Sequence, residues 1–444
     1  MRLRLLVRAR KDAKAVEAAL RLFYRDFDYT VEHLGGLRGE ALASEAAARA
    51  RPFTVILLPE REASLLDPGV LPPYSTLVPV GARDVRNLRL EQIASLIARG
   101  RAALRLSASW LWSLGAYRLD GCTPPTGLEA DPSMDVTILY SKGLEALSGL
   151  LGLELRGHAL AYLGGGTARI HYAGSLIGEV GLSECPPRAA ALQAPPGAVP
   201  GGLEALLEAN RGALEAALRA MADWLAVEAG GARLVAVPWS GGKDSTAALV
   251  LAVEALGPER VVAVHVDTGL EFPETEEYVE EVASRLGVEL VRVHAGLDAE
   301  ARRRGLPVRG DRWCTGLKLA ALSRALRGIA ASRGPPVVVV GDRDAESASR
   351  SRRPPVRLDP YHGLRTLAPL KLLSAAHTLL IPLLRGVEPN PLYAEGFYRI
   401  GCFTCPYMSC WERLLMERGL ASRVAGARPD ALGLLERFLS RGPL

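Results

Sequence analysis

The sequence predicts an α/β protein with a doubly wound parallel sheet, preceded by an N-terminal α/β segment and a small β-rich module. From Arg233 onward, short β-branched apolar runs alternate with helical patterns, which is typical of a parallel sheet covered on both faces. The 444 residues are 49% hydrophobic and 23% charged, so the composition is globular and excludes disordered and collagen-like chains. This length predicts two to four domains.

The pattern changes four times along the chain, and each change marks an expected boundary. The expected parts are an N-terminal α/β domain at 1–125, a β-rich module at 126–189, a linker at 190–202, a main α/β domain at 203–411 and a C-terminal helical segment at 412–444.

In the N-terminal part, we expect strands at Arg2–Val7 and Phe53–Leu58 and helices at Ala13–Phe23 and Leu88–Leu106. In the module, short apolar runs separated by Gly-rich turns predict strands at Val136–Tyr140, His158–Tyr162, Ala168–Tyr172 and Ser175–Val180. The linker AALQAPPGAVPGG carries no charge.

The main domain opens with a long amphipathic helix at Leu203–Val227. Strands are then expected at Leu234–Val237, Val261–Val266, Leu290–His294 and Val337–Val340, with helices at Lys243–Leu256, Pro273–Leu286 and Gly316–Arg327.

Charge and termini narrow the function classes only slightly. The net charge of +5 allows an anionic ligand or RNA without requiring either. The charged start lacks a signal-peptide core, and Lys371, His377 and two prolines interrupt the longest apolar stretch, so we expect a cytoplasmic protein without membrane contact. Asn and Gln are scarce, which fits a hot environment or a GC-rich genome.

The strongest local signal is the run Ser240-Gly241-Gly242-Lys243-Asp244-Ser245, between a buried strand and a helix. Glycines let backbone amides turn inward, and the following helix start is positively polarised. Lys is rare in this chain, so Lys243 is a specific signal. The run predicts a phosphate site, although it matches neither the Walker loop nor the dinucleotide fingerprint.

A second signal follows the next strand. Asp267-Thr268-Gly269 stands where that strand ends, which is the edge at which ligands bind in open α/β sheets. Pro273 then suits the first turn of a helix.

These motifs carry a family resemblance. The loop resembles the S-G-G-x-D-S loop of the ATP-pyrophosphatase (PP-loop, adenine nucleotide alpha hydrolase-like) superfamily. Four further runs resemble, in order, the motifs of the phosphoadenosine phosphosulfate (PAPS) reductase family: Asp267–Thr275, Arg312–Thr315 with Lys318, Gly341–Arg350, and Pro389–Cys405. The resemblance covers about residues 230–411 and leaves residues 1–200 uncovered.

The resemblance implies a set of site residues. For the nucleotide these are Ser240, Gly241, Gly242, Lys243, Asp244, Ser245, Thr246, Asp267, Thr268, Gly269 and Ser347. Lys243, Asp244, Arg343 and Arg350 are the implied catalytic residues, with Arg343, Ser347 and Arg350 facing the anionic end of the nucleotide.

Two departures from the thioredoxin-linked reductases favour ATP over a sulfonucleotide (PAPS or APS). No cysteine follows Cys410, and Lys243 is intact beside Asp244, which could hold Mg²⁺. The leading hypothesis is cleavage of ATP between its α and β phosphates to adenylylate an acceptor in sulfur transfer. The alternatives are a sulfonucleotide reductase that uses an external thiol and a non-catalytic nucleotide or redox sensor. The implied partners are a sulfur donor or reductant protein.

RNA remains a possible partner through the module. The G-x-x-x-G-E-V-G rhythm from Gly174 to Gly181 resembles a PUA-type RNA-binding barrel. An unrelated β insert is the interpretation we favour, because short strands carry little identity.

The cysteines suggest a metal centre. Cys402, Cys405 and Cys410, together with Cys314, could supply four thiolates to a [4Fe–4S] cluster. Zinc and free or redox-active thiols are the alternatives. Cys122 and Cys185 are expected to be small buried residues.

Overall fold

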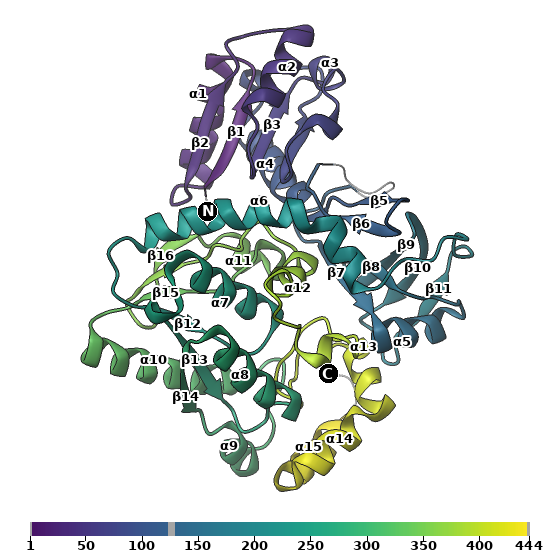
Figure 1. Ribbon diagram of the computed structural model, residues 1–444, viewed down its shortest axis with the longest axis vertical. Coiled ribbons are helices and arrows are strands. Elements are labelled where there is room, and N and C mark those ends of the chain that lie inside the picture. Colours follow the sequence, from purple (N-terminus) through teal and green to yellow (C-terminus); the bar gives the residue numbers. More distant parts are fainter. Residues whose placement is uncertain (1, 123–128, 442–444) are drawn as a thin grey trace.

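The computed structural model describes residues 2–122 and 129–441, and its strands form three larger sheets and one hairpin. The N-terminal sheet, the antiparallel sheet of the module and the main sheet follow one another along the chain (Figure 1). The expected boundary at 125/126 lies outside the described residues.

The N-terminal sheet is parallel, in the order β2-β1-β3-β4, and is covered on both faces. Leu5, Val7 and Val55 pack toward α1 and α4, whereas Leu6 and Ile56 pack toward α2. The elements are β1 (Leu3–Val7), α1 (Arg10–Phe23), β2 (Tyr29–His33), α2 (Gly39–Arg49), β3 (Thr54–Leu58), α3 (Glu60–Ala63), β4 (Ser75–Pro79) and α4 (Leu90–Leu106).

The module is a five-stranded antiparallel sheet in the order β11-β10-β9-β8-β7. A hairpin of β5 (Ser109–Leu111) and β6 (Ala116–Arg118) precedes it. The elements of the module are β7 (Asp135–Tyr140), α5 (Ser141–Leu151), β8 (His158–Gly164), β9 (Thr167–Tyr172), β10 (Ser175–Gly181) and β11 (Ala189–Ala191). Strand β11 takes the first two residues of the expected linker, and the likeness to a PUA barrel stays an expectation.

The main sheet confirms the expected fold class. Its order is β14-β13-β12-β15-β17-β16, and all neighbours are parallel except β16 and β17. The strands are β12 (Val235–Pro238), β13 (Val261–Asp267), β14 (Glu289–His294), β15 (Val337–Val339), β16 (Val356–Leu358) and β17 (Arg365–Leu367).

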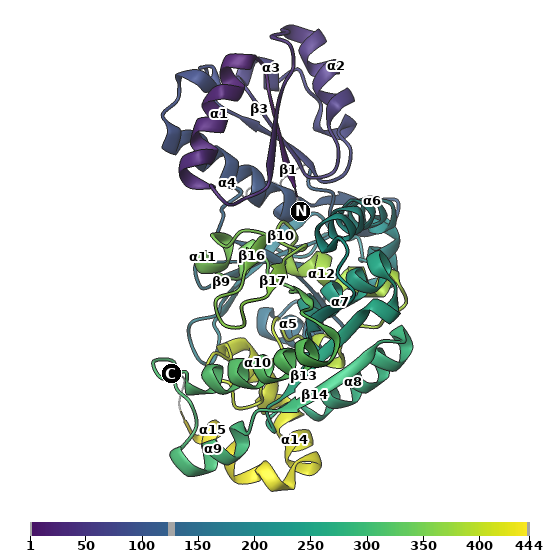
Figure 2. The same cartoon turned by 90° about the vertical axis from the view of Figure 1, so that its left-hand side faces the viewer.

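Helices cover both faces of this sheet. Val235 and Val237 pack with α7, α8 and α12, whereas Ala236 packs with α10. The helices are α6 (Leu203–Ala229), α7 (Lys243–Leu256), α8 (Pro273–Leu286), α9 (Leu297–Arg304), α10 (Trp313–Arg333), α11 (Ala348–Ser351) and α12 (Ala375–Leu384). Helix α6 lies between the N-terminal sheet and the main sheet (Figure 2).

The C-terminal segment consists of α13 (Cys410–Leu415), a π-turn at Met416–Leu420, α14 (Ala421–Ala427) and α15 (Leu432–Ser440). Trp411 and Leu415 share a core with Leu139 and Leu147 of the module. None of the helices in the described ranges combines the length and the apolar character that a membrane crossing needs.

Candidate functional site

The phosphate loop follows β12 at the carboxyl edge of the main sheet and leads directly into α7. Gly241 has a φ of +70°, and a Cβ there would lie 2.9 Å from Cγ2 of Thr275, so only glycine fits without strain. The Asn390 amide donates to the Gly241 carbonyl oxygen at 3.3 Å and to Thr275 Oγ1 at 3.2 Å. These contacts fix the shape of the loop.

The loop presents backbone donors. In the part of the chain that the structure describes, the amides of Gly241, Gly242 and Asp244 have no acceptor, whereas the Lys243 amide donates to Tyr393 Oη at 2.7 Å. Ser240 Oγ and Ser245 Oγ lie 3.1 Å apart beside them. Unpaired amides at the positive end of a 14-residue helix form a site for a phosphate group.

A cavity of about 480 Å³ opens over this loop. The loop residues share it with three thiols and four cationic side chains. Its lining includes Ser240, Gly242, Lys243, Asp244 and Ser245 of the loop, the thiols of Cys314, Cys402 and Cys405, and the cations of Arg312, Lys318, Arg350 and Arg399. We call it the nucleotide cavity below, because its size and cationic lining suit a nucleotide.

A neighbouring cavity of about 410 Å³ shares Ser240, Lys318 and Arg350 with the first. Its remaining wall is largely apolar and includes Trp239, Val264 and Leu322. The two cavities together offer a charged end beside the loop and an apolar end beside β13.

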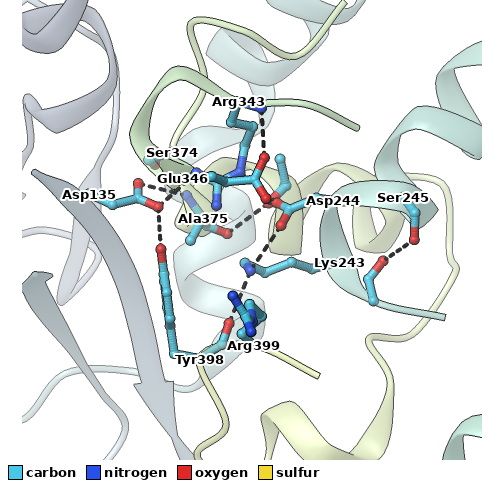
Figure 3. A network of polar contacts seen from close by, with 12 residues as sticks. Asp135, Lys243, Asp244, Ser245, Arg343, Glu346, Ser374, Ala375, Tyr398 and Arg399 are labelled. Atoms are coloured by element: carbon cyan, nitrogen blue, oxygen red, sulfur yellow. Dashed lines mark hydrogen bonds and ion pairs between the residues drawn. The ribbon is translucent and has the colours of Figure 1, made fainter. Parts of the chain in front are cut away.

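A buried charge network lies behind the loop (Figure 3). The Arg343 guanidinium, 1% exposed, donates from Nε to Asp244 Oδ1 at 2.7 Å and from Nη1 to Asp135 Oδ2 at 2.7 Å. Thr378 Oγ1 donates to Asp244 Oδ1 at 2.6 Å, and Lys243 Nζ lies 3.1 Å from Asp244 Oδ2. Lys243 Nζ also donates to the Tyr398 carbonyl at 3.0 Å.

This network keeps both carboxyl groups ionised. Burial opposes ionisation of Asp244, but the charges of Arg343 and Lys243 hold its pKa well below the usual range. At Asp135, burial is likewise outweighed by Arg343 and by the Tyr398 hydroxyl, which lower the pKa.

The network corrects two expectations. Arg343 was expected to face the anionic end of a nucleotide, but it is enclosed between two carboxylates and has no free face for a ligand. Asp244 was expected to hold Mg²⁺, but three donors already occupy its carboxylate. The Asp244 carboxylate thus lies against Lys243, and Arg343 lies behind Asp244, away from the lining of the cavity.

Of the other residues that the sequence predicts for the site, Arg350 lines the cavities, whereas Ser347 and Thr246 do not. Arg350 lines both cavities and pairs with Glu346. Ser347 is exposed and caps α11 by accepting the Arg350 amide, and it does not line the nucleotide cavity. Thr246 is buried and accepts the Trp239 indole N–H at 2.9 Å.

The Asp267-Thr268-Gly269 turn lies beside the nucleotide cavity without lining it. Asp267 accepts the Gly269 amide at 2.7 Å and contacts His294 Nδ1 at 3.2 Å. Burial opposes ionisation of Asp267, but these contacts outweigh it and lower the pKa of the carboxyl group. Thr268 Oγ1 lies 3.4 Å from Cys402 Sγ, so the turn supports that thiol.

The cysteines do not meet as a four-thiolate site. Cys410, expected as the fourth ligand, is joined to Cys185 by a disulfide, so Cys185 is also not the isolated buried residue that was expected. Cys314, Cys402 and Cys405 line the nucleotide cavity, but among the described residues their sulfur atoms do not all lie within 4.8 Å of one another. The distances do not fit a single zinc ion, and with Cys410 in the disulfide only three of the four thiolates expected for a [4Fe–4S] cluster are available.

Cys402 has the most distinctive surroundings of the three. Lys318 Nζ lies 3.3 Å from its sulfur atom. Burial raises the pKa of Cys402, and Lys318 only partly offsets that effect. Burial opposes the charge on Lys318, but Cys402 and the Glu271 carboxylate raise its pKa overall.

Sequence reasoning missed several residues of the site. Asn390, which holds the loop, lies in the Asn-Pro-Leu-Tyr run and could have been found there. Asp135 and Thr378 gave no local signal, because each reaches the network from a segment more than 100 residues away from Lys243. Arg399 was also missed.

Residues 234–408 match the family model of the phosphoadenosine phosphosulfate reductase domain. An adenosine 5′-phosphosulfate reductase of Rhizobium tropici is 31% identical over 147 residues, which cover 31% of this chain and 78% of that protein. The chain belongs to the phosphoadenosine phosphosulfate reductase family. An uncharacterized protein of Methanocaldococcus jannaschii is 34% identical over 187 residues, covering 41% of this chain and 38% of that relative.

A second protein of Methanocaldococcus jannaschii is 29% identical over 171 residues, which cover 38% of this chain and 40% of that relative. The chain thus spans about 40% of the length of each of these two archaeal relatives. Among solved structures, a phosphoadenylyl-sulfate (PAPS) reductase from Candida auris is 19% identical, with a TM-score of 0.34, over 42% of this chain and 89% of that one. An NH3-dependent NAD synthetase from Campylobacter jejuni is 14% identical, with a TM-score of 0.31, over 51% of this chain and 93% of that one.

Proposed function

We propose that this chain is an adenine-nucleotide enzyme that binds ATP, cleaves it between the α and β phosphates and adenylylates an acceptor in sulfur transfer. The observation that carries this proposal is the set of unpaired amides of Gly241, Gly242 and Asp244 beneath a cavity of about 480 Å³. These amides suit the β and γ phosphates, which ATP has and a sulfonucleotide lacks.

The contribution of the chain would be positioning and charge stabilisation. Lys243, held from behind by Asp244, supplies positive charge at the start of α7, and Arg350 adds a second cation across the cavity. Preorganised donors of this kind stabilise the charge that gathers on the phosphates as the α–β bond breaks. The apolar cavity beside β13 would take the adenine ring.

The test is ATP–pyrophosphate exchange with Lys243→Met, and Lys14→Met on the exposed face of α1 is the matched control. Loss of a preorganised cation should lower the exchange rate about 100-fold or more, while the control keeps the wild-type rate. Because Lys243 is buried, the melting temperature of each variant is measured as well. Exchange that persists in a folded Lys243→Met protein would reject the proposal.

One observation favours a second function. The Cys402 thiol lies in the nucleotide cavity 3.3 Å from Lys318, and the Rhizobium tropici relative is named as an adenosine 5′-phosphosulfate reductase. In a reductase, the Cys402 thiolate would bond to the sulfur of the sulfonucleotide, AMP would leave, and an external dithiol would then release sulfite. The raised pKa of Cys402 opposes this role, because it disfavours the thiolate.

Sulfite release from adenosine 5′-phosphosulfate with dithiothreitol separates the two functions. The ATP proposal predicts no sulfite from wild-type protein. Sulfite that appears with wild-type protein and disappears with Cys402→Ser would favour the reductase.

A further inference from the structure

A third cavity, of about 340 Å³, lies between the module and the end of the main domain. One wall is the apolar face of the antiparallel sheet, with Leu139, Ala168 and Ile170. The opposite wall carries Trp411, whose indole N–H donates to the Gly396 carbonyl at 2.8 Å and is therefore fixed in place. The volume lies within the range of small-molecule sites. We call it the acceptor cavity.

The acceptor cavity adjoins the nucleotide cavity. Glu346, Arg399 and Tyr407 line both. The ion pair of Asp135 with Arg343 also joins a side chain that lines the acceptor cavity to the network behind the phosphate loop. A molecule in one cavity would therefore lie against a molecule in the other.

The acidic groups of the acceptor cavity already have partners. Asp135 pairs with Arg343, and Glu346 pairs with Arg350. Glu412 accepts the backbone amides of Arg399 and Ser409 at 3.1 and 2.9 Å. Asp135 and Glu346 are thus balanced by arginines, whereas Glu412, at the start of α13, has no cationic partner among the described residues but has both carboxylate oxygens turned to backbone amides.

Arg399 is different. Its side chain is exposed, and no carboxylate in residues 2–122 and 129–441 forms an ion pair with its guanidinium. Figure 3 shows it next to Tyr398 at the edge of the buried network. An apolar wall facing an exposed guanidinium without an ion-pair partner suits an apolar molecule that carries an oxyanion.

We propose that the acceptor cavity binds the second substrate, a small organic anion with an apolar body against the sheet and its oxyanion at Arg399. Its role as the adenylyl acceptor rests on the proposed function. In that role, an anionic oxygen of the acceptor bonds to the α-phosphorus of ATP. The bond between the α-phosphorus and the bridging oxygen breaks, and pyrophosphate leaves with the electron pair. No proton transfer is needed, because the attacking oxygen is already ionised.

The test uses the fluorescent anion 8-anilinonaphthalene-1-sulfonate and its uncharged relative N-phenyl-1-naphthylamine on the full chain. Ala168→Leu narrows the cavity, and Arg399→Gln removes the cation. The matched controls are Arg169→Gln, on the opposite face of β9 beside Glu179, and Ala190→Leu, on the exposed side of β11. Leu182→Trp, at a half-buried lining position, replaces Ala168→Leu if that variant does not fold.

We expect both cavity variants to weaken binding of the anion about tenfold or more, because Arg399→Gln removes a charged hydrogen bond and Ala168→Leu removes space. Only Ala168→Leu should weaken binding of the uncharged dye, and the controls should change neither. Displacement of the bound anion by 2-naphthoate would identify a carboxylate acceptor, and displacement by 1-naphthyl phosphate would identify a phosphate acceptor. Dye binding that is unchanged in Ala168→Leu, or displacement by neither compound, would overturn the proposal.

ATP binding is measured on the same variants by calorimetry. Wild-type protein that binds the dye at this cavity but not ATP would reject the proposed function and keep the anion site. Wild-type protein that binds ATP but shows no cavity-dependent dye binding would reject only the anion site.

Discussion

At the scale of single residues, Arg343 is the centre of the charge network although it does not line the nucleotide cavity. It joins Asp135 of the module to Asp244 of the phosphate loop, and all three side chains lie within one hydrogen-bonded network. Arg343 can stabilise the site only while the carboxylates of Asp135 and Asp244 remain charged, because a buried charge without a partner is costly.

Asp135→Asn should therefore destabilise the protein by about 3 kcal/mol, because it leaves the buried Arg343 with one carboxylate instead of two. Unfolding in guanidinium chloride measures the change. Asp131→Asn, at an exposed position four residues earlier, is the matched control and should have little effect. Equal stability of the two variants would show that the network does not hold the module.

Two buried histidines predict an acid-sensitive fold. Burial lowers the pKa of both His171 and His377 to about 4, whereas in an unfolded chain each would titrate near its ordinary value of 6.5. Below about pH 6.5 the unfolded chain binds more protons, so this contribution to stability is complete above that pH and is lost as the pH falls toward 4.

Each histidine should cost about 3 kcal/mol of stability between pH 7 and pH 4. Melting temperatures measured across this range should fall, and the fall should be smaller in His377→Gln than in wild-type protein. An identical pH profile in the variant would contradict the assignment to His377.

The sequence predicted those residues of the site that stand close together in one short motif. Ser240, Lys243 and Ser245 stand in one short run, and the structure places them around one cavity. From the sequence, Arg343 was expected to contact the phosphates and Asp244 to hold Mg²⁺, because their side chains suit these ligands. In the structure, Arg343 pairs with Asp244 and Asp135, and Asp244 also accepts from Thr378. Such pairing between distant segments leaves no local pattern in the sequence.

At the scale of elements, the close approach of β15 to α7 shapes the phosphate loop from the side. A Cβ on Gly341, which follows β15, would lie 2.5 Å from the Asp244 carbonyl oxygen. The loop after β15 can reach the first turn of α7 only because residue 341 has no side chain.

Gly341→Ala should therefore push α7 away from its position and weaken ATP binding about tenfold or more, since donors at such a site act only when they are well aligned. Calorimetric titration measures the affinity. Gly328→Ala in α10, where a Cβ meets nothing within 4 Å, is the control, and it should keep the affinity and raise stability by up to about 1 kcal/mol. Unchanged ATP affinity in Gly341→Ala would contradict this account of the loop.

Strands β16 and β17 and helices α9 and α12 of the main domain were not predicted, whereas β12, β13 and β15 could be predicted as short, mostly buried apolar runs and some helices from a recognisable start. Pro273, for example, opens α8 as expected. Strand β11 could not be predicted, because Ala189–Ala191 has no strand-forming composition and is held only by pairing with Val180, Glu179 and Gly178 of β10. The pairing with β10, rather than the local sequence, therefore determines that these residues form a strand.

At the scale of the whole molecule, the N-terminal half contributes directly to the site. The module supplies Asp135 and one wall of the acceptor cavity, and the C-terminal segment supplies Trp411. No local pattern in the sequence indicates this arrangement, because the two halves are joined by long-range contacts and by the disulfide of Cys185 and Cys410, which lie 225 residues apart in the chain.

The disulfide predicts a thiol count. Of the six cysteines, Cys122, Cys314, Cys402 and Cys405 are free, so denatured protein that was never reduced should show about four thiols per chain by alkylation and mass spectrometry. A peptide containing Cys185 linked to one containing Cys410 should appear in the same digest. Six free thiols, or iron bound with Cys410 as a ligand, would contradict this pairing.

The central claim is that the amides at the start of α7, together with Lys243, hold the phosphates of a nucleoside triphosphate. Calorimetric titration of the wild-type chain and of Lys243→Met with ATP and with AMP tests it most directly. We predict that wild-type protein binds ATP more tightly than AMP and that Lys243→Met removes this difference. Equal affinity of the wild-type chain for ATP and AMP, or no binding of either, would contradict the claim.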